Sequence, residues 1–285
     1  MNKPYFIAEI SSNHNNSLSR IKKLIASAKQ SGFDAVKFQV FKIKELFHRN
    51  VLNKSKLHRD REKWELNLNY LEQIRRECNK NKIELGFTPF YLEAVDVLEK
   101  YADFYKIASY ELLWTDLIKK CAKKNKKLII STGMANMQEV EKAYKSATKY
   151  LNKNKLSFLH CVSSYPASYK QCNLSSIKTL RSNFKCRVGW SDHTTDKDVI
   201  IRAVNYWNAD EIEMHFDIDG NGFEANVGHC WLPKDCYDLI NTIRKNELMD
   251  GLDGKKPSDV EKLERNWRAD PRDGLRPLLK IRNKI

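Results

Sequence analysis

The chain has 285 residues, 41% of them hydrophobic and 31% charged, which is enough to bury one large core. Its formal net charge of +15 would suit a nucleic-acid-binding protein, but the lysines fall mainly on expected outer helix faces and no aromatic-and-basic nucleic-acid module is present. No signal peptide and no apolar stretch of about 20 residues is found. We therefore expect a cytoplasmic protein with no nucleic-acid or membrane partner. Seven cysteines without a CxxC pair favour reduced thiols.

Short apolar runs alternate with amphipathic helical stretches along the chain. The first strand is expected at residues 6–10, followed by a helix from about Leu18 to Gln30 with Ser17 or Ser19 as its N-cap. Further strands are expected at 35–40, 83–87, 104–108, 127–131, 156–161, 187–190 and 211–216, each followed by a helix. Eight such units predict an α/β protein with a (β/α)8 TIM barrel. A doubly wound open sheet is the alternative, but no GxGxxG follows the first strand.

The barrel is expected to fill residues 1–251, and a short charged tail residues 252–285. Residues 42–61 form a long polar connection between the second strand and its helix. The sequence shows no internal repeat beyond the strand–helix alternation itself.

Polar side chains gather where the expected strands end, and barrel enzymes build their active sites at that end. One polar strand end means little, but eight together predict a site. In strand order, the groups are Glu9, Asn13 and His14; Lys37 and Gln39; Thr88; Lys106, Ser109 and Glu111; Ser131; His160, Ser163 and Tyr165; Ser191, Asp192 and His193; and Glu213 and His215.

His193 and His215 follow neighbouring strands, which places their imidazoles close enough to share one metal ion. The alternative is a pair of polar rim histidines that bind nothing. Cys161 or Cys230 could add a thiolate and favour zinc, although a buried, inert cysteine is the commoner state.

Lys37 and Lys106 lie inside otherwise apolar strands, where an unpaired ammonium group would be costly. An anionic ligand is therefore expected beside them, although lysines are most often simply solvated. Glu9 and Glu111 are candidates for moving protons, with a salt bridge to Lys37 or Lys106 as the alternative role.

Eight stretches, in order from residue 5 to about 220, resemble the sialic acid synthase (N-acetylneuraminate synthase) family. They are Ala8-Glu9-Ile10 with Asn13-His14-Asn15, Val36-Lys37-Phe38-Gln39, Phe87-Thr88-Pro89-Phe90, Tyr105-Lys106-Ile107-Ala108-Ser109, Ser131-Thr132-Gly133-Met134, His160-Cys161 with Tyr165-Pro166, Ser191-Asp192-His193-Thr194 and His215-Phe216. Related synthases make N-acetylneuraminate, pseudaminate or legionaminate, so the resemblance implies the reaction class more firmly than the sugar.

The resemblance implies a transferase whose partners are phosphoenolpyruvate and an N-acyl amino-sugar aldehyde. The enzyme would join these two into a nonulosonic acid and release phosphate. It implies a divalent metal, Mn²⁺ before Mg²⁺ or Co²⁺, at His193 and His215, catalytic roles for these histidines, Glu9 and Glu111, and a homodimer. Asp192 is expected to orient a histidine, and Glu213 a neighbouring group. Substrate contacts are expected from Lys37, Gln39, Thr88, Lys106, Ser109, Ser131, Ser163, Tyr165, Ser191, Asn13, His14 and Glu224.

The sequence departs from the family in three places. Typical members continue into an antifreeze-like domain, for which the expected tail is too short. Ser163 stands at a family position that can be Asn. In the loop after the eighth strand, Glu224 is expected to replace a family aspartate, and His229 and Trp231 to cover the sugar pocket. The tail, with Trp267, Arg268, Arg272 and Arg276, is the alternative cover or a contact with a partner subunit.

Two other functional classes stay open. A barrel aldolase or phosphate-sugar isomerase would use Lys37 or Lys106 as a Schiff base. A noncatalytic relative would bind an acidic sugar or a partner without turnover.

Overall fold

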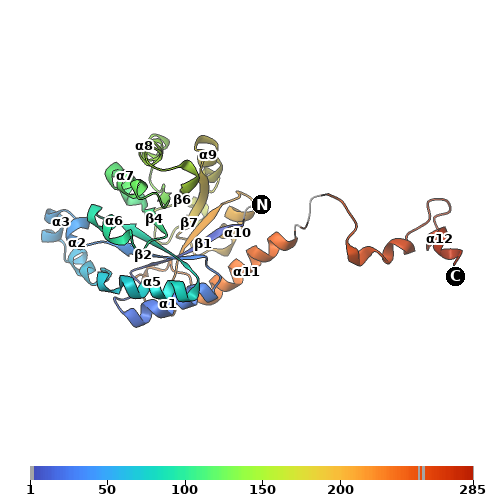
Figure 1. Ribbon diagram of the computed structural model, residues 1–285, viewed down its shortest axis with the longest axis horizontal. Coiled ribbons are helices and arrows are strands. Elements are labelled where there is room, and N and C mark those ends of the chain that lie inside the picture. The colour runs from blue at the N-terminus through green and yellow to red at the C-terminus, as the bar shows by residue number, and fades with distance from the viewer. Residues whose placement is uncertain (1–2, 250, 252–253, 285) are drawn as a thin grey trace. The chain divides into compact units, whose positions relative to one another are not determined.

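The computed structural model describes residues 3–249, 251 and 254–284. Its eight parallel strands close into a barrel in sequence order, with β8 paired to β1, which confirms the expected (β/α)8 fold (Figure 1). The strands are β1 (Tyr5–Ser11), β2 (Ala35–Val40), β3 (Glu84–Pro89), β4 (Phe104–Ile107), β5 (Lys127–Ser131), β6 (Leu156–Cys161), β7 (Arg187–Asp192) and β8 (Glu211–His215).

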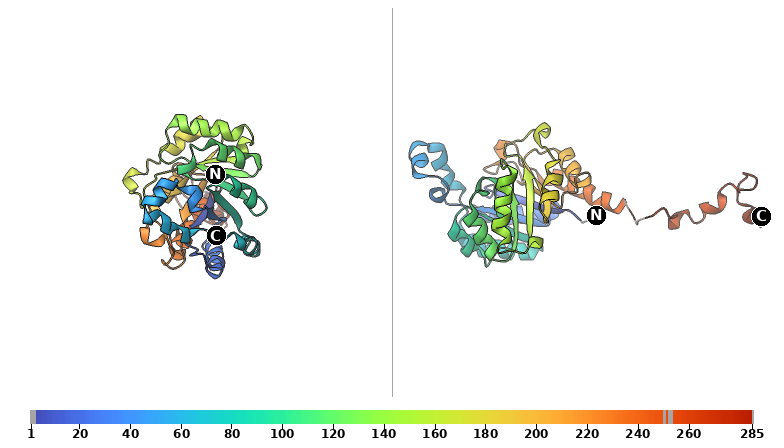
Figure 2. Two further views of the ribbon diagram at one scale, coloured as in Figure 1. Left: turned by 90° about the vertical axis from the view of Figure 1, so that its left-hand side faces the viewer. Right: turned by 90° about the horizontal axis from the view of Figure 1, so that it is seen from above.

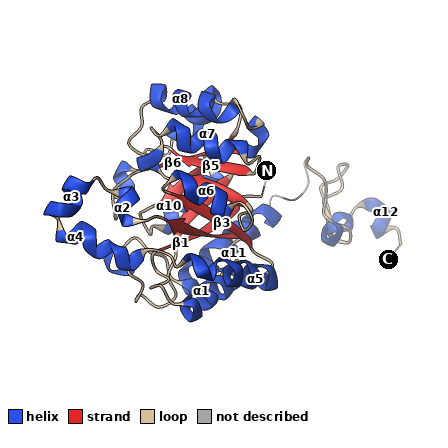
Figure 3. Ribbon diagram, turned by 60° about the vertical axis from the view of Figure 1, so that its left-hand side comes forward, coloured by secondary structure: helices blue, strands red, loops and turns tan. Residues whose placement is uncertain are grey.

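Helices surround this barrel on the outside (Figure 3). They are α1 (Leu18–Gln30), α5 (Leu71–Asn81), α6 (Leu92–Leu98), α7 (Thr115–Lys123), α8 (Met137–Thr148), α9 (Ser176–Asn183), α10 (Lys197–Asn205) and α11 (Pro233–Met249). In α1 the buried residues recur at helical spacing, at Ile21, Leu24, Ile25 and Ala28, which turns one face to the sheet. Ser17, rather than Ser19, caps this helix by accepting a hydrogen bond from the Arg20 backbone N–H.

The hydrophobic residues form two separate layers. Ile7, Ala35, Phe104, Ile129 and Leu159 pack together as one small cluster contributed by five different strands. A larger cluster lies between the strands and the outer helices. The barrel is therefore a packed core, and a ligand can reach only the ends of the strands.

The connection after β2 forms short helices rather than an open loop. It consists of α2 (Ile43–Leu46), α3 (Arg49–Lys54), α4 (Lys56–Arg59) and the 3-10 helices η1 (Asp60–Trp64) and η2 (Leu68–Tyr70). We call residues 43–64 the β2 arm, which projects from the barrel as the blue segment in Figure 2. Trp64 stacks on Phe223 from the loop after β8, with ring centres 6.2 Å apart. The arm therefore contacts the same end of the barrel as the expected site.

The chain divides into two compact units, Met1–Glu247 and Leu248–Ile285. The expected start of the tail at residue 252 lies outside the described residues. In the second unit Asp270 is buried and accepts hydrogen bonds from the backbone N–H groups of Arg272 and Leu279. A short helix, α12 (Leu279–Arg282), ends this unit. Within the described ranges, no helix is both long enough and apolar enough to span a bilayer.

Candidate active site

Two lysines and two glutamates meet inside the barrel near the carboxyl ends of the strands. Glu9 pairs with Lys37 on the neighbouring strand, where the two residues are in register. Lys37 also donates a hydrogen bond to Thr88 Oγ1 at 2.8 Å and lies 3.7 Å from Glu213 Oε2. Glu213 Oε1 lies 3.3 Å from Lys106 Nζ. All five side chains are at most 3% exposed, so four charges from β1, β2, β4 and β8 form one buried network with a neutral sum.

Burial and pairing compete in setting the charges of this network. Burial favours a protonated Glu213, but the ammonium groups of Lys106 and Lys37 outweigh it and lower the pKa of Glu213 to about 2. Ser191 adds a hydrogen bond to Glu213 Oε1 at 2.9 Å. Burial lowers the pKa of Lys37, and the Glu213 carboxylate acts in the opposite direction. Glu213 is therefore held as an anion beside the two lysines, and its charge opposes the effect of burial on the pKa of Lys37.

Three imidazoles and one carboxylate cluster beside this network. The ring centres of His193 and His215 lie 5.4 Å apart, those of His215 and His229 4.5 Å, and those of His193 and His229 6.4 Å. Glu224 Oε2 lies 3.2 Å from His215 Nδ1 and 3.9 Å from His229 Nε2. Tyr165 packs on this group, with its ring centre 4.3 Å from that of His193. We call His193, His215, Glu224 and His229 the histidine–glutamate cluster.

Burial favours the neutral imidazole at His193 and at His229. Burial, together with His215, lowers the pKa of His193 to about 3, and burial lowers that of His229 to about 4. His193 Nδ1 lies 2.7 Å from the Val162 carbonyl oxygen, which leaves Nε2 as the free ligand atom. Donor atoms of His215, Glu224 and His229 all lie within 4.8 Å of one another. Neutral imidazole is the form that binds a metal.

The loop after β8 is fixed to the loop after β1, because barrel closure makes these strands neighbours. Asn13 Oδ1 accepts a hydrogen bond from the Glu224 backbone N–H at 2.9 Å, and its Nδ2 donates to the Phe216 carbonyl at 3.1 Å. Arg20 on α1 forms an ion pair with the buried Asp217 at 2.5 Å. Asn13 is fully buried and its amide positions Glu224, and the substrate contact expected for Asn13 stays a prediction.

A second polar group lies around Gly133, just after β5. A side chain at Gly133 would collide with Ser163 Oγ, Ser109 Oγ and Cys161 Sγ, so glycine is needed for the backbone to approach them. Ser109 Oγ accepts a hydrogen bond from the Gly133 N–H at 3.0 Å and lies 3.1 Å from Cys161 Sγ. The hydroxyls of Ser131 and Ser163 are buried without a hydrogen-bond partner among the described residues. Two free hydroxyls in this position can bind ligand oxygens.

The remaining expected site residues lie at the same end of the barrel. Gln39 is half-buried and in register with Thr88. His14 is buried, and its Nδ1 accepts a hydrogen bond from the Asn16 N–H at 2.9 Å. Glu111 lies in the 3-10 helix η3 (Ser109–Glu111), where burial raises its pKa to about 7 while Lys106 opposes the shift. A carboxyl group with a pKa near neutrality can both accept and donate a proton.

Comparison with known proteins decides the family. The model of the NeuB family matches residues 24–255 of this chain. The chain belongs to the NeuB family. The expectation of a sialic acid synthase-like enzyme is confirmed.

Several relatives of the chain are named as synthases of nonulosonic acids. The chain is 35% identical to the N,N'-diacetyllegionaminic acid synthase of Campylobacter jejuni, over 92% of this chain and 81% of that protein. It is 36% identical to the synthase of the same name from Legionella pneumophila, over 90% of this chain and 76% of that protein. Among solved structures, the N-acetylneuraminic acid synthetase of Leptospira borgpetersenii superposes with a TM-score of 0.81 at 27% identity, over 92% of this chain and 90% of that chain.

Two expectations for this NeuB-family chain need correction. Asp192 was expected to orient a histidine, but it accepts hydrogen bonds from the indole N–H groups of Trp190 at 3.0 Å and Trp231 at 2.9 Å. Alternate residues of a strand share a face, so Asp192 lies on the side of Trp190, which belongs to the outer core. Trp231 is 3% exposed in that same core and does not cover the mouth of the barrel.

The contribution of His229 was only partly foreseen. We expected it to cover the sugar pocket, whereas the structure places its ring against His215 and Glu224. The loop from 216 to 229 has no periodic pattern, so the spacing of His215, Glu224 and His229 gave no signal of a cluster. A hint was the concentration of two potential ligands within six residues of one loop.

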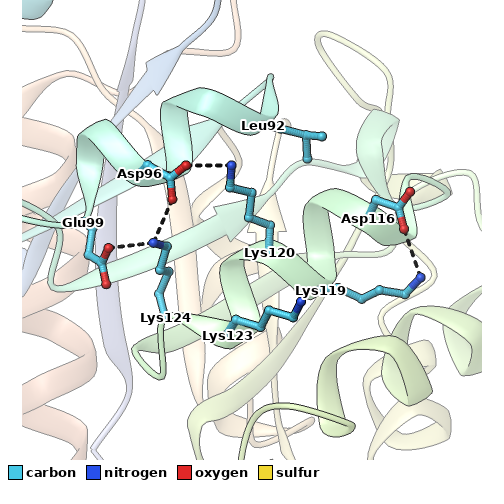
Figure 4. A pocket seen from close by; sticks show the side chains of 8 residues that line it. All are labelled: Leu92, Asp96, Glu99, Asp116, Lys119, Lys120, Lys123 and Lys124. Carbon is cyan, nitrogen blue, oxygen red and sulfur yellow. Dashed lines mark hydrogen bonds and ion pairs between the residues drawn. The ribbon is translucent and has the colours of Figure 1, made fainter.

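A surface groove between α6 and α7 belongs to the outside of the barrel rather than to this site. It is lined by Leu92, Asp96, Glu99, Asp116, Lys119, Lys120, Lys123 and Lys124. Asp96 pairs with Lys120 at 2.7 Å and with Lys124 at 2.8 Å (Figure 4). Exposed pairs of this kind contribute about 0–1 kcal/mol each. The groove therefore reflects a salt-bridged helix surface.

Proposed function

We propose that this chain condenses phosphoenolpyruvate with an N-acyl amino-sugar aldehyde, giving a nonulosonic acid and phosphate. The observation that carries the proposal is the convergence of the buried lysines Lys37 and Lys106 with the histidine–glutamate cluster at one end of a closed barrel. The lysines suit an anion, and the cluster suits a cation that binds a sugar oxygen. Membership of a family of nonulosonic acid synthases supports the same reaction.

Phosphoenolpyruvate would bind between the lysines and the free hydroxyls. Its phosphate and carboxylate need fixed cations and O–H or N–H donors that converge from several strands. Lys37 and Lys106 supply the charge, and Glu9 and Glu213 neutralise them before the ligand binds. The hydroxyl donors proposed for the ligand are those of Thr88, Ser109, Ser131, Ser163 and Ser191.

The residues at the mouth fit a divalent cation. Ring centres 5.4 Å apart suit two imidazoles on one ion, and the lowered pKa of His193 keeps its ring neutral and able to bind. His193 and His215 would hold the ion, for which Mn²⁺ is proposed before Mg²⁺ or Co²⁺ because imidazole and carboxylate are mixed here. Bound there, the cation would polarise the aldehyde of the open-chain sugar.

Protein side chains would accept and donate the protons that the reaction moves. C3 of phosphoenolpyruvate attacks the aldehyde carbon, water adds at C2, and the C–O bond to phosphate breaks. Glu111 would take the proton from the attacking water, because its pKa near 7 lets it ionise at neutral pH. Glu9, already paired with Lys37, would position that water. Tyr165, Gln39, His14 and Glu224 would line the sugar side of the mouth.

Phosphate release tests the proposal directly. The chain would be incubated with phosphoenolpyruvate and a panel of mannose-type sugars that carry one or two acetamido groups, with and without a chelator. The names of the Campylobacter and Legionella relatives make a di-N-acetylated sugar the first acceptor to try. We expect phosphate release that needs both substrates and is lost with the chelator. Release with no acceptor dependence, or none with any acceptor, would reject the proposed reaction.

A further inference from the structure

The ring of His229 is buried without the partners that a buried imidazole needs. The residue is 3% exposed, and its Nδ1 has no hydrogen-bond partner within the described part of the chain. Its Nε2 lies 3.9 Å from Glu224 Oε2, which is too long for a hydrogen bond. Leaving a buried polar atom without a hydrogen-bond partner is unfavourable. The Nε2 atom that faces Glu224 is therefore free to bind a ligand.

The distances within the cluster match those between ligands of a single ion. With bonds of about 2.1 Å, two ligand atoms at right angles lie about 3.0 Å apart and two opposite ones about 4.2 Å apart. Glu224 Oε2 lies 3.2 Å from His215 Nδ1 and 3.9 Å from His229 Nε2, and both distances fall in this interval.

The ring centres give an independent check that does not depend on which nitrogen binds. An imidazole centre lies about 3.2 Å from an ion bonded at about 2.1 Å, so two such centres are about 4.6 Å apart at right angles and about 6.5 Å apart when opposite. The three pairs formed by His193, His215 and His229 measure 5.4, 4.5 and 6.4 Å. The ring spacings are therefore compatible with one ion, and the donor atoms that meet within 4.8 Å of one another are those of His215, Glu224 and His229.

We propose that Glu224 and His229 bind the cation directly, together with His193 and His215, so that the loop after β8 supplies two of four protein ligands. This inference rests on the proposed function only in taking one cation to bind at this mouth. Ser11 and Asn13 hold Glu224 in place, through its Oε1 and its backbone N–H respectively. Carboxylate ligands favour Mn²⁺, whereas imidazoles alone suit Zn²⁺ well, so Glu224 would set the preference between these ions.

The alternative is that Glu224 only orients His215 through a hydrogen bond and that His229 binds nothing. Pulsed EPR on the unchanged full chain loaded with Mn²⁺ distinguishes this alternative from the proposal. The measurement counts the nitrogen atoms coupled to the ion and needs no variant. Three coupled nitrogens are expected from the proposal, and His229→Gln should reduce them to two. Two couplings in the unchanged protein would overturn the role of His229.

Titration of the chelator-treated protein with Mn²⁺, followed by the EPR signal of the free ion and by competition with Zn²⁺, tests Glu224. Glu224→Gln should lower the ratio of Mn²⁺ to Zn²⁺ affinity by about tenfold or more, because Mn²⁺ prefers a carboxylate oxygen more strongly than Zn²⁺, which imidazoles bind well. Equal weakening of both ions would overturn direct binding, since a residue acting only through His215 affects them alike. Glu211→Gln, which removes a buried carboxylate at the start of β8 and outside the cluster, is the matched control and should bind both ions as the unchanged chain does.

These measurements contain no substrate and are therefore separate from the proposed reaction. If phosphate is released from both substrates but Mn²⁺ has two nitrogen ligands, the ligand assignment fails and the reaction stands. If three nitrogens bind Mn²⁺ and no acceptor supports phosphate release, the reaction fails and the ligand assignment stands.

Discussion

Replacing Glu213 by glutamine would remove the anion that pairs with two buried lysines while keeping the shape of the side chain. Lys37 would keep Glu9 and Thr88, so Lys106 is the ammonium group left without its carboxylate. Breaking a buried ion pair on one side costs about 3–5 kcal/mol, and glutamine, which keeps an acceptor, should cost about 3 kcal/mol. For a domain of this size each kcal/mol lowers Tm by about 2–4 °C, so the expected loss is roughly 6–12 °C.

Thermal unfolding by circular dichroism at pH 7, with and without inorganic phosphate, measures this effect. Phosphate should raise the Tm of Glu213→Gln more than that of the unchanged protein, because Lys106 can then pair with the added anion. The double variant Glu213→Leu with Lys106→Met should recover most of the lost Tm, since an apolar pair buries no charge. A Tm within about 2 °C of the unchanged protein, with the same response to phosphate, would refute the reasoning.

The difference in Tm between Glu213→Gln and the unchanged protein should depend on pH in a definite direction. Lys106 and Lys37 lower the pKa of Glu213 from 4.5 to about 2, against the opposing effect of burial. The stabilisation from its charge is therefore complete above pH 4.5 and is lost as the pH falls towards about 2. The difference in Tm between the two proteins should shrink over that interval.

Three further predictions concern catalysis. His193→Ala and His215→Ala should each abolish phosphate release from phosphoenolpyruvate, and near-normal turnover in both would contradict a role for a cation there. Because burial raises the pKa of Glu111 to about 7 and the group acts ionised, kcat should fall as the pH drops through 7. Glu111→Gln should lower kcat by about 10²-fold or more and lose this pH dependence, and a retained acidic limb would assign it to another group. Borohydride with a carbonyl substrate should trap no adduct at Lys37 or Lys106, and a trapped adduct would favour the Schiff-base aldolase.

The sequence was sufficient to predict the barrel because its strands carry a strong local signal. The strand expected at 35–40 is β2, and that expected at 127–131 is β5, with the same bounds. Strand ends were less certain: β7 continues to Asp192 rather than to 190, and β4 ends at Ile107 rather than 108. Pairing with a neighbouring strand extends or shortens the last residues, and that depends on contacts distant in sequence.

The sequence predicted those residues of the site that lie at the ends of strands. Lys37 and Lys106 were recognised as costly in apolar strands, and the structure gives each a buried carboxylate partner. The salt bridge proposed as the alternative role of Glu9 is the contact seen with Lys37. Asp192 was misassigned because its position beside a histidine in sequence was weighed above the alternation of faces along a strand.

The part of the site that local patterns could not predict is built on the closure of the barrel. Closure makes β8 a neighbour of β1, with His215 in register with Glu9 although 206 positions separate them. Only this contact brings the Asn13 loop under Glu224, and the Glu224 backbone is held by the Asn13 amide, not by its own strand. The sequence predicts a substrate contact for this asparagine, and its support of Glu224 could be recognised only in the structure. Because Asn13 follows the first strand and Glu224 follows the last, the histidine–glutamate cluster can form only after the last strand has joined the first.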